Sequence, residues 1–226
     1  MPDSGMNSQM SYTITDNNGC FSTGSFTIPV FYTFQNEEIC LVSVDTLAWK
    51  NKVMWEGTPG VGTDKFRIYK ESTFNVYDLI GEVPYGSQTF FIDAGSNPES
   101  HSDRYKISVV DTCGSESEMS FYHNTMNLIV SVFGSTMGLS WTQYATEDGS
   151  YTPSEYFIYK GPSPTSMQLL TTVSGSQNTY NDVNVFDLQY YMIGAERGCN
   201  IYPTYSNKRD NGMVANEAQY LAGTVL

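Results

Sequence analysis

The sequence predicts an all-β protein built from two tandem β-sandwiches, and three observations support this prediction. First, a stretch of about ninety residues occurs twice, so that Trp55 is matched by Trp141 at an offset of 86 residues. Second, short runs of Val, Ile, Tyr and Phe alternate with polar residues, as a strand with one buried face requires. Third, Gly, Pro, Ser, Thr and Asn interrupt these runs, and no window has the spacing of an amphipathic helix. A repeat of this length is too long for a solenoid unit and suits a small sandwich.

The two copies match at the segments that we expect to form core strands. Phe66–Lys70 in the first copy corresponds to Tyr156–Lys160 in the second. Further along, Tyr105 corresponds to Tyr191, again at an offset of 86 residues. Alternate residues of such strands face one core, so each copy is expected to bury its own set of apolar side chains.

The residues before the first copy predict a β-hairpin. Ser11–Asp16 and Phe21–Pro29 have the composition of strands, and Asn17–Gly19 has that of a turn. An isolated hairpin is marginally stable in water. We therefore expect these strands to be the last two of a third module whose beginning is missing.

These patterns divide the chain into four segments. We expect a partial module over 1–36, one sandwich over 37–124, a second over 125–211 and a tail over 212–226. The segment from Tyr122 to Leu128 between the two copies is too short for free rotation. This short connection predicts an elongated, semi-rigid rod.

Composition limits the classes of partner. The net charge is −13, with 11 Lys and Arg against 24 Asp and Glu, which argues against nucleic acid because phosphate binding needs a basic surface. No apolar run approaches the roughly 20 residues that span a bilayer, so we expect no membrane insertion. The first ten residues also lack the basic start and apolar stretch of a signal peptide. If the protein is secreted, we expect this chain to be a fragment or a processed form of a longer one.

Each long copy resembles a fibronectin type III domain. Trp55 and Trp141 stand in the place of the core Trp of strand B, and Tyr105 and Tyr191 stand in that of the Tyr of strand F. The resemblance implies a fibronectin type III-like β-sandwich for each copy.

A more specific resemblance is carried by four blocks and by the hairpin. Glu38–Asp45, Asp78–Gly81, Tyr105–Ser117 and His123–Leu128 resemble the paired fibronectin type III modules near the end of large type IX-secreted surface proteins of gliding bacteria. Tyr12–Cys20 is similar to the closing strands of the immunoglobulin-like repeats that precede such pairs. The similarity implies a secreted, extracellular or cell-surface protein whose modules act as a spacer or adhesive stalk and perform no catalysis.

This resemblance extends to about Asn211, and its most specific part is Val110–Ser117. The sequence departs from the family at its end, since Gly212–Leu226 contains no C-terminal sorting domain of that secretion pathway. Export by the type IX route is therefore an expectation by analogy.

The fibronectin-type topology also implies a disulfide. Strand A begins at the end of the sandwich where strand F finishes, which would bring Cys40 near Cys113. We predict a bond between them, which would stabilise the fold by roughly 4 kcal/mol in the chain-entropy model. The alternative is two reduced, partly buried thiols. Cys20 and Cys199 have no evident partners, and a bond between them would need the chain to fold back on itself.

Few residues suit catalysis or metal binding. His101 and His123 are the only histidines, and neither lies in a motif that marks a nucleophile, so we predict no catalytic residues and no cofactor. Asp16–Asn18 and Glu147–Gly149 carry oxygen ligands, but Asp and Asn are common in such turns for conformational reasons. The four cysteines lack the paired spacing of a zinc site. We predict no metal site, and we expect His123 to fix the joint between the modules.

Three tyrosines flank a polar loop in the second copy, namely Tyr144, Tyr151 and Tyr156. They either cover the edge of the sandwich or offer a surface for sugars or proteins. Two alternative functions follow. The chain could be a subunit of a polymeric appendage that self-associates by strand addition through residues 1–36 or Met213–Leu226, or an ancillary carbohydrate-binding pair of a secreted enzyme. The expected partners are other domains of the parent protein, surface proteins or glycans, and further copies.

Overall fold

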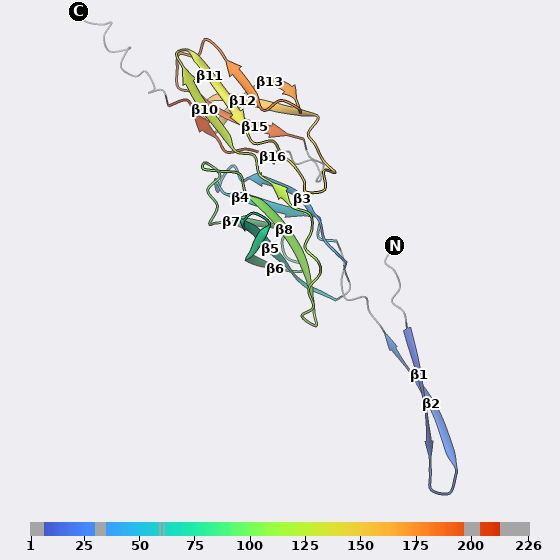
Figure 1. Ribbon diagram of the computed structural model, residues 1–226. Coiled ribbons are helices and arrows are strands. Elements are labelled where there is room, and N and C mark those ends of the chain that lie inside the picture. The colour runs from blue at the N-terminus through green and yellow to red at the C-terminus, as the bar shows by residue number, and fades with distance from the viewer. Residues whose placement is uncertain (1–6, 30–34, 59, 61, 197–203, 213–226) are drawn as a thin grey trace, which may run out of the picture.

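The computed structural model describes residues 7–29, 35–58, 60, 62–196 and 204–212. In this part of the chain all regular structure is β-strand, which confirms the predicted all-β class of tandem sandwiches. The described residues include no helix long and apolar enough to cross a membrane. Figure 1 shows a separate hairpin followed by two stacked sandwiches.

The first sandwich pairs a three-stranded sheet with a four-stranded sheet. The orders are β3-β4-β7 and β6-β5-β8-β9, with all neighbours antiparallel. These two sheets form the β-sandwich expected from the sequence. The strands are β3 (Ile39–Val44), β4 (Asn51–Trp55), β5 (Thr63–Thr73), β6 (Val76–Pro84), β7 (Phe90–Asp93), β8 (Arg104–Asp111) and β9 (His123–Asn124).

The second sandwich repeats this arrangement. Its sheets have the orders β10-β11-β14 and β13-β12-β15-β16, and β17 also pairs with β15. The strands are β10 (Leu128–Phe133), β11 (Thr136–Trp141), β12 (Glu155–Ser163), β13 (Ser166–Ser174), β14 (Thr179–Asp182), β15 (Tyr190–Ala195), β16 (Thr204–Tyr205) and β17 (Arg209–Asp210).

Matched aromatic pairs form the centre of each core. The rings of Trp55 and Phe66 lie 5.3 Å apart, and those of Trp141 and Tyr156 lie 5.5 Å apart. These positions are the ones that the internal repeat aligns. Burial raises the pKa of Tyr156 to about 12, as expected for a phenol in an apolar core. The buried residues of both sandwiches form one continuous cluster, which includes Met126 and Leu128 from the connecting region.

Serine side chains replace part of the ladder that attaches the last strand of each sandwich. The N–H of Ile107 in β8 donates to Oγ of Ser120, whose own N–H donates to the Ile107 carbonyl. Ile193 and Ser206 repeat this pair of bonds in the second sandwich. Because a hydroxyl takes the place of a backbone acceptor, regular pairing is short here, and β9, β16 and β17 have only two residues each.

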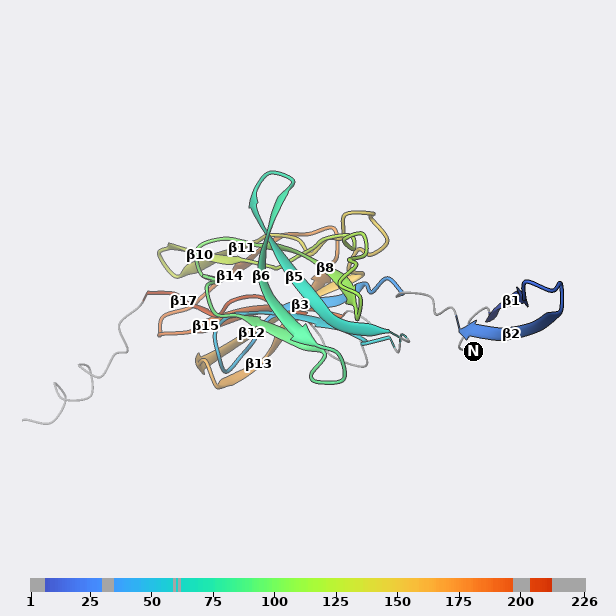
Figure 2. The ribbon, with the colours of Figure 1, turned by 90° about the horizontal axis from the view of Figure 1, so that it is seen from below.

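The two sandwiches lie side by side along β3. Oγ1 of Thr204 donates to the carbonyl of Val42 at 2.6 Å, and the N–H of Tyr205 donates to Oγ of Ser43 at 3.0 Å. The sandwiches are stacked in Figure 1 and overlap in the perpendicular view of Figure 2. The expectation of an end-to-end rod was therefore wrong. The physical reason is that β3 is an edge strand, and the second sandwich covers the backbone groups that this edge would otherwise expose.

The N-terminal hairpin forms as predicted. β1 (Asn7–Thr15) pairs with β2 (Phe21–Pro29) in an unbroken antiparallel register. Its turn is held by Asp16, whose Oδ1 accepts from the N–H groups of Asn18 and Cys20. Gly19 has φ +82°, a value that favours glycine. Figure 1 shows the hairpin apart from both sandwiches.

Candidate functional site

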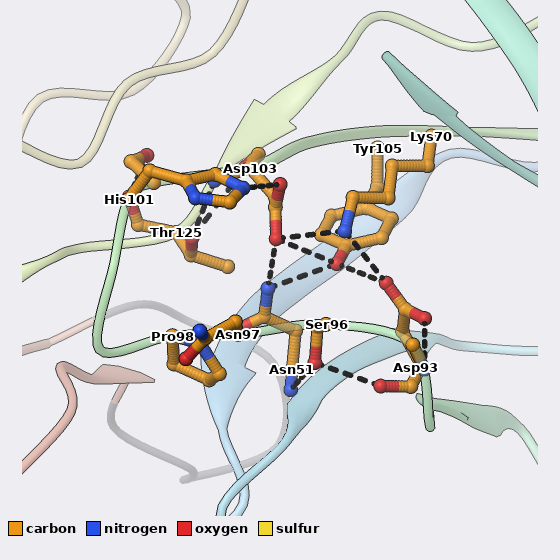
Figure 3. A network of polar contacts seen from close by, with 12 residues as sticks. Asn51, Lys70, Asp93, Ser96, Asn97, Pro98, His101, Asp103, Tyr105 and Thr125 are labelled. Atoms are coloured by element: carbon orange, nitrogen blue, oxygen red, sulfur yellow. Dashed lines mark hydrogen bonds and ion pairs between the residues drawn. The ribbon is translucent and has the colours of Figure 1, made fainter. Parts of the chain in front are cut away.

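A buried polar network occupies one end of the first sandwich (Figure 3). Lys70 enters it from β5, Asp93 from the end of β7 and Tyr105 from β8. Nζ of Lys70 lies 3.1 Å from Oδ2 of Asp93, to which the hydroxyl of Tyr105 donates at 2.8 Å. The Asp93 side chain is only 8% exposed. One ammonium, one carboxylate and one phenol therefore connect the neighbouring strands β5 and β8 of one sheet to β7 of the other.

A second carboxylate joins this group from the loop before β8. Oδ2 of Asp103 lies 3.0 Å from Nζ of Lys70, and the Asp103 side chain is 4% exposed. Nδ2 of Asn51 donates to the same oxygen at 2.7 Å and to the hydroxyl of Tyr105 at 2.9 Å. A single ammonium thus faces two buried carboxylates, and the Asn51 amide helps to hold one of them in place.

This arrangement changes the ionisation of two groups. Burial, followed by the charges of Asp103 and Asp93, raises the pKa of Tyr105 well above its usual value. Burial by itself would lower the pKa of Lys70, but its hydrogen bonds to Asp103 and Asp93 raise it. Tyr105 is therefore a neutral hydrogen-bond donor, and Lys70 is a cation, over the physiological range of pH.

The second sandwich keeps only part of the network. Nζ of Lys160 lies 2.7 Å from Oδ2 of Asp182, to which the hydroxyl of Tyr191 donates at 2.7 Å. These three residues match Lys70, Asp93 and Tyr105 in the repeat. At an offset of 86 residues, however, the positions of Asp103 and Asn51 are taken by Gln189 and Met137. The Lys-Asp-Tyr group is common to both copies, and the second carboxylate belongs to the first copy alone.

The network is continuous with the connection between the sandwiches. The N–H of Asp103 donates to Oγ1 of Thr125, and the N–H of Thr125 donates to the Asp103 carbonyl, each at 2.9 Å. Nδ2 of Asn127 donates to the carbonyl of Pro98 at 2.6 Å. These bonds fix the connecting segment against the loop that carries Asp103.

The interface between the sandwiches is completed by aromatic residues. The N–H of Val42 donates to the hydroxyl oxygen of Tyr144, and this hydroxyl also pairs with Nδ1 of His123 at 2.8 Å. Tyr144 and His123 are almost fully buried, with 1% and 3% exposure. His123 thus lies at the joint, where the sequence placed it, and its ring pairs with the Tyr144 phenol.

A second set of contacts holds the far end of this interface. Nζ of Lys208 lies 5.5 Å from the centre of the Trp49 ring, and Arg209 binds Glu99. Trp49 has a φ of +56°, which is unusual for a bulky residue. The loop between β3 and β4 and the loop between β7 and β8 are therefore also tied to the second sandwich.

His101 has the neighbours of a catalytic histidine, but their geometry does not suit that role. Its Nδ1 pairs with Oγ of Ser100, and its Nε2 lies 3.0 Å from Oδ1 of Asp103. Oγ of Ser100 also donates to the carbonyl of Asn97, so its proton is already engaged. The serine proton is thus directed at a backbone carbonyl and away from the ring, unlike that of a nucleophile activated by a general base.

The predicted disulfide between Cys40 and Cys113 is absent, so this prediction was wrong. Cys113 is a free, exposed thiol in the turn after β8, where Oδ1 of Asp111 accepts from its N–H. Cys40 occupies a bulge in β3 and packs partly against the core. The turn leaves the Cys113 thiol exposed to solvent, whereas the Cys40 side chain is partly buried against the core. Cys40 is disulfide-bonded, Cys20 is free and exposed, and Cys199 lies outside the described residues.

The tyrosines considered as a sugar-binding surface are mostly interior residues. Tyr144 and Tyr156 are 1% and 0% exposed, so they cover the joint and the core. Tyr151 stacks edge-on against Tyr144 at 5.7 Å. The idea that Tyr144 contacts a glycan was therefore wrong, because its ring and hydroxyl are committed to the interface.

The acidic turns are explained by local hydrogen bonds. Oδ1 of Asp148 accepts from the N–H of Ser150, and Glu147 binds Lys106 and the N–H of Tyr122. Among the described residues, no three His, Cys, Asp or Glu side chains are grouped as metal ligands would be.

The sequence matches no protein-family model and no curated protein. Among solved structures, the chain is similar to the central fibronectin-III array of RIM-binding protein (11% identity, 77% of this chain and 67% of that chain, TM-score 0.33). It is also similar to a two-domain fibronectin type-III segment of chicken tenascin (20% identity, 80% and 99%, TM-score 0.31) and to the FN1–FN3 domains of chicken CNTN1 (12% identity, 89% and 76%, TM-score 0.31). The fold assignment rests on the strand order, because structural similarities with TM-scores this low carry no further argument.

The network was missed in the sequence although a signal was present. Lys70, Asp93 and Tyr105 recur as Lys160, Asp182 and Tyr191 at nearly constant offsets. A repeated charged pair inside segments that otherwise alternate apolar and polar residues indicates a shared buried interaction. Asp103 gives no such signal, since the repeat does not preserve it.

Proposed function

We propose that the chain is a non-enzymatic pair of sandwiches that acts as a stiff spacer or adhesive stalk in a larger extracellular or cell-surface protein. The observation that carries this proposal is that side chains of the second sandwich bind backbone groups of the edge strand β3. The Val42 N–H and C=O are both bonded to side chains of the second sandwich, namely Tyr144 and Thr204. Relative motion of the sandwiches would break these buried bonds, and a buried polar group without a partner costs about 1–3 kcal/mol. The pair should therefore transmit position and force as one body.

The polar groups of the described chain support a structural role. The Lys70 network, the Lys160 pair and the acidic turns use their carboxylates in internal bonds. In the group of Ser100, His101 and Asp103, the serine hydroxyl donates to a backbone carbonyl. An active site would instead need a nucleophile whose proton is directed at a base.

Secretion by the type IX route, in a gliding or adhesive surface protein, is the finer form of this proposal. Its support is the sequence resemblance, above all at Val110–Ser117. Labelling of intact source cells with an antibody to the sandwiches tests the location. Staining of intact cells is expected, and staining only after lysis would overturn the surface assignment.

The stiffness of the pair can be tested by pulse-labelled hydrogen exchange at increasing urea, read by mass spectrometry. Peptides from β4 and β11 report the two cores separately. A continuous core predicts coincident midpoints, because neither sandwich can unfold without exposing the shared interface. Separate midpoints, with one core unprotected while the other remains closed, would show two independent modules and refute the stiff pair.

The hairpin supports a second candidate, a subunit of a polymeric appendage. Met10, Tyr12, Ile14 and Phe26 lie on one face of the hairpin, and each is at least half exposed. Such a face, on strands with open edges, suits addition to another copy. Deletion of residues 1–36 tests this idea by analytical ultracentrifugation. An unchanged number of copies per particle after the deletion would exclude the hairpin as the assembly element. The other candidate segment, Met213–Leu226, lies outside the described residues.

A further inference from the structure

We propose that the first sandwich forms a covalent amide between Nζ of Lys70 and the side-chain carboxyl of Asp93, with Asp103 carrying protons. This cross-link goes beyond the spacer function and does not depend on it. The amine already touches both carboxylates, at 3.1 Å from Asp93 and 3.0 Å from Asp103. Figure 3 shows the ammonium between them. Holding two reacting groups in contact replaces an improbable encounter by a step within one molecule.

Asp93 is the carboxyl that is prepared for attack. Its Oδ2 accepts the hydroxyl of Tyr105 at 2.8 Å, and its Oδ1 accepts the N–H of Gly95 at 3.0 Å. Donors on both oxygens withdraw electron density from Cγ and stabilise the negative charge that develops when the amine adds. The Asp93 side chain is 8% exposed, so water is largely excluded from the reacting atoms.

Asp103 is placed to carry the protons. It contacts the same ammonium, and Nδ2 of Asn51 holds its Oδ2 at 2.7 Å. Its other oxygen, Oδ1, lies 3.0 Å from Nε2 of His101, so Asp103 connects the ammonium to a second group that can exchange protons. Asp103 can therefore accept a proton from Nζ and return it to the departing oxygen of Asp93.

The step balances without any further reagent. The Nζ–Cγ bond forms and one Cγ–O bond of Asp93 breaks. Two protons pass from the ammonium to the departing oxygen, which leaves as one water molecule. Asp103 ends in the state in which it began, and no atom changes its oxidation state.

The second sandwich supplies an internal control. Lys160, Asp182 and Tyr191 have the same contacts as Lys70, Asp93 and Tyr105. Gln189 stands at the position of Asp103, so this lysine has one carboxylate partner among the described residues. Without a proton carrier we expect Lys160 and Asp182 to remain an ion pair.

Intact mass of the reduced, denatured full chain tests the proposal. Loss of one water lowers the mass by about 18 Da relative to the sequence. A tryptic digest is expected to contain one branched peptide that joins β5 to β7 through Lys70 and Asp93. A full sequence mass, with Lys70 recovered as an ordinary residue, would overturn the proposal.

Two variants then separate the roles. Asp103→Asn keeps the size of the side chain and removes the proton carrier, so we expect the full sequence mass with an unchanged near-UV circular dichroism spectrum. Lys160→Met is the matched control and should retain the loss of one water. Retention of that loss in Asp103→Asn would refute the role of Asp103. Its disappearance in Lys160→Met would place the link in the second sandwich and refute the assignment to Lys70.

Discussion

The backbone N–H of Val42 donates to the phenolic oxygen of Tyr144 at 3.2 Å, across 102 residues of sequence and from one sandwich to the other. The same hydroxyl pairs with Nδ1 of His123 at the joint. One side chain of the second sandwich thus satisfies an edge strand of the first and orients the residue that begins the connection.

Replacing Tyr144 by Phe removes one oxygen and leaves the ring in place. The Val42 N–H and the His123 ring would then be buried without their present partner, and we expect a loss of about 1–3 kcal/mol in the free energy of unfolding. Urea denaturation followed by circular dichroism measures this change.

The matched control for that variant is Tyr12→Phe in the hairpin, where the ring is 50% exposed. A surface substitution of this kind should alter stability by no more than about 0.5 kcal/mol. Equal losses in the free energy of unfolding for the two variants would mean that the Tyr144 hydroxyl does not stabilise the interface.

The two lysines of the repeated network should differ in their contribution to stability. Lys70→Met leaves Asp93 and Asp103 buried and facing each other, and breaking a buried pair in this way costs about 3–5 kcal/mol. Lys160→Met leaves only Asp182, to which Tyr191 still donates, so its cost should be smaller. Urea midpoints of the two variants give the order. If the proposed amide is present, Lys70→Met also removes it, which would increase the destabilisation and leave the order unchanged. A greater destabilisation by Lys160→Met would contradict the prediction.

The Glu116 carboxylate should make the free energy of unfolding depend on pH. Burial by itself would raise the pKa of Glu116, but hydrogen bonds from Ser108, Tyr69 and Arg67 hold it below its usual value. A carboxylate with a lowered folded-state pKa stabilises the fold above the unfolded-state pKa, and this contribution is lost as pH falls through the folded-state pKa. We expect Glu116→Gln to destabilise the protein at pH 7, with a difference that shrinks below about pH 4.

Unfolding at a series of pH values checks this prediction, with Glu118→Gln as the control. Glu118 is an exposed neighbour in the same segment. Because the side chain is exposed, its variant should differ from the wild type by no more than about 0.5 kcal/mol at pH 7. A constant difference for Glu116→Gln across the series would show that its effect does not come from ionisation.

The cysteines should separate into two classes under alkylation. Cys20 and Cys113 are free and exposed, so iodoacetamide should label both in the native, unreduced protein. Cys40 is disulfide-bonded and should be labelled only after reduction. Peptide mapping reads all sites at once, and recovery of a peptide that links Cys40 to Cys113 would restore the pairing that the structure lacks.

The sequence by itself determined the strands, the two copies and their cores. Alternation of apolar and polar residues is a property of neighbours along the chain, so it could be read at Phe66–Lys70 without any tertiary information. The repeat then aligned Trp55 with Trp141, and both proved to be core residues packed on a matched aromatic ring.

Tertiary structure alone decided how the sandwiches meet and which polar groups they share. Val42 and Tyr144 carry no mark in the sequence that pairs them, because their contact depends on which edge the second sandwich covers. Cys113 was misassigned for a similar reason: strand topology brings chain ends together, but the direction of a thiol depends on a turn and a bulge. Asp103 reached Lys70 through the path of a loop, and loop paths are set by long-range contacts that no local pattern records.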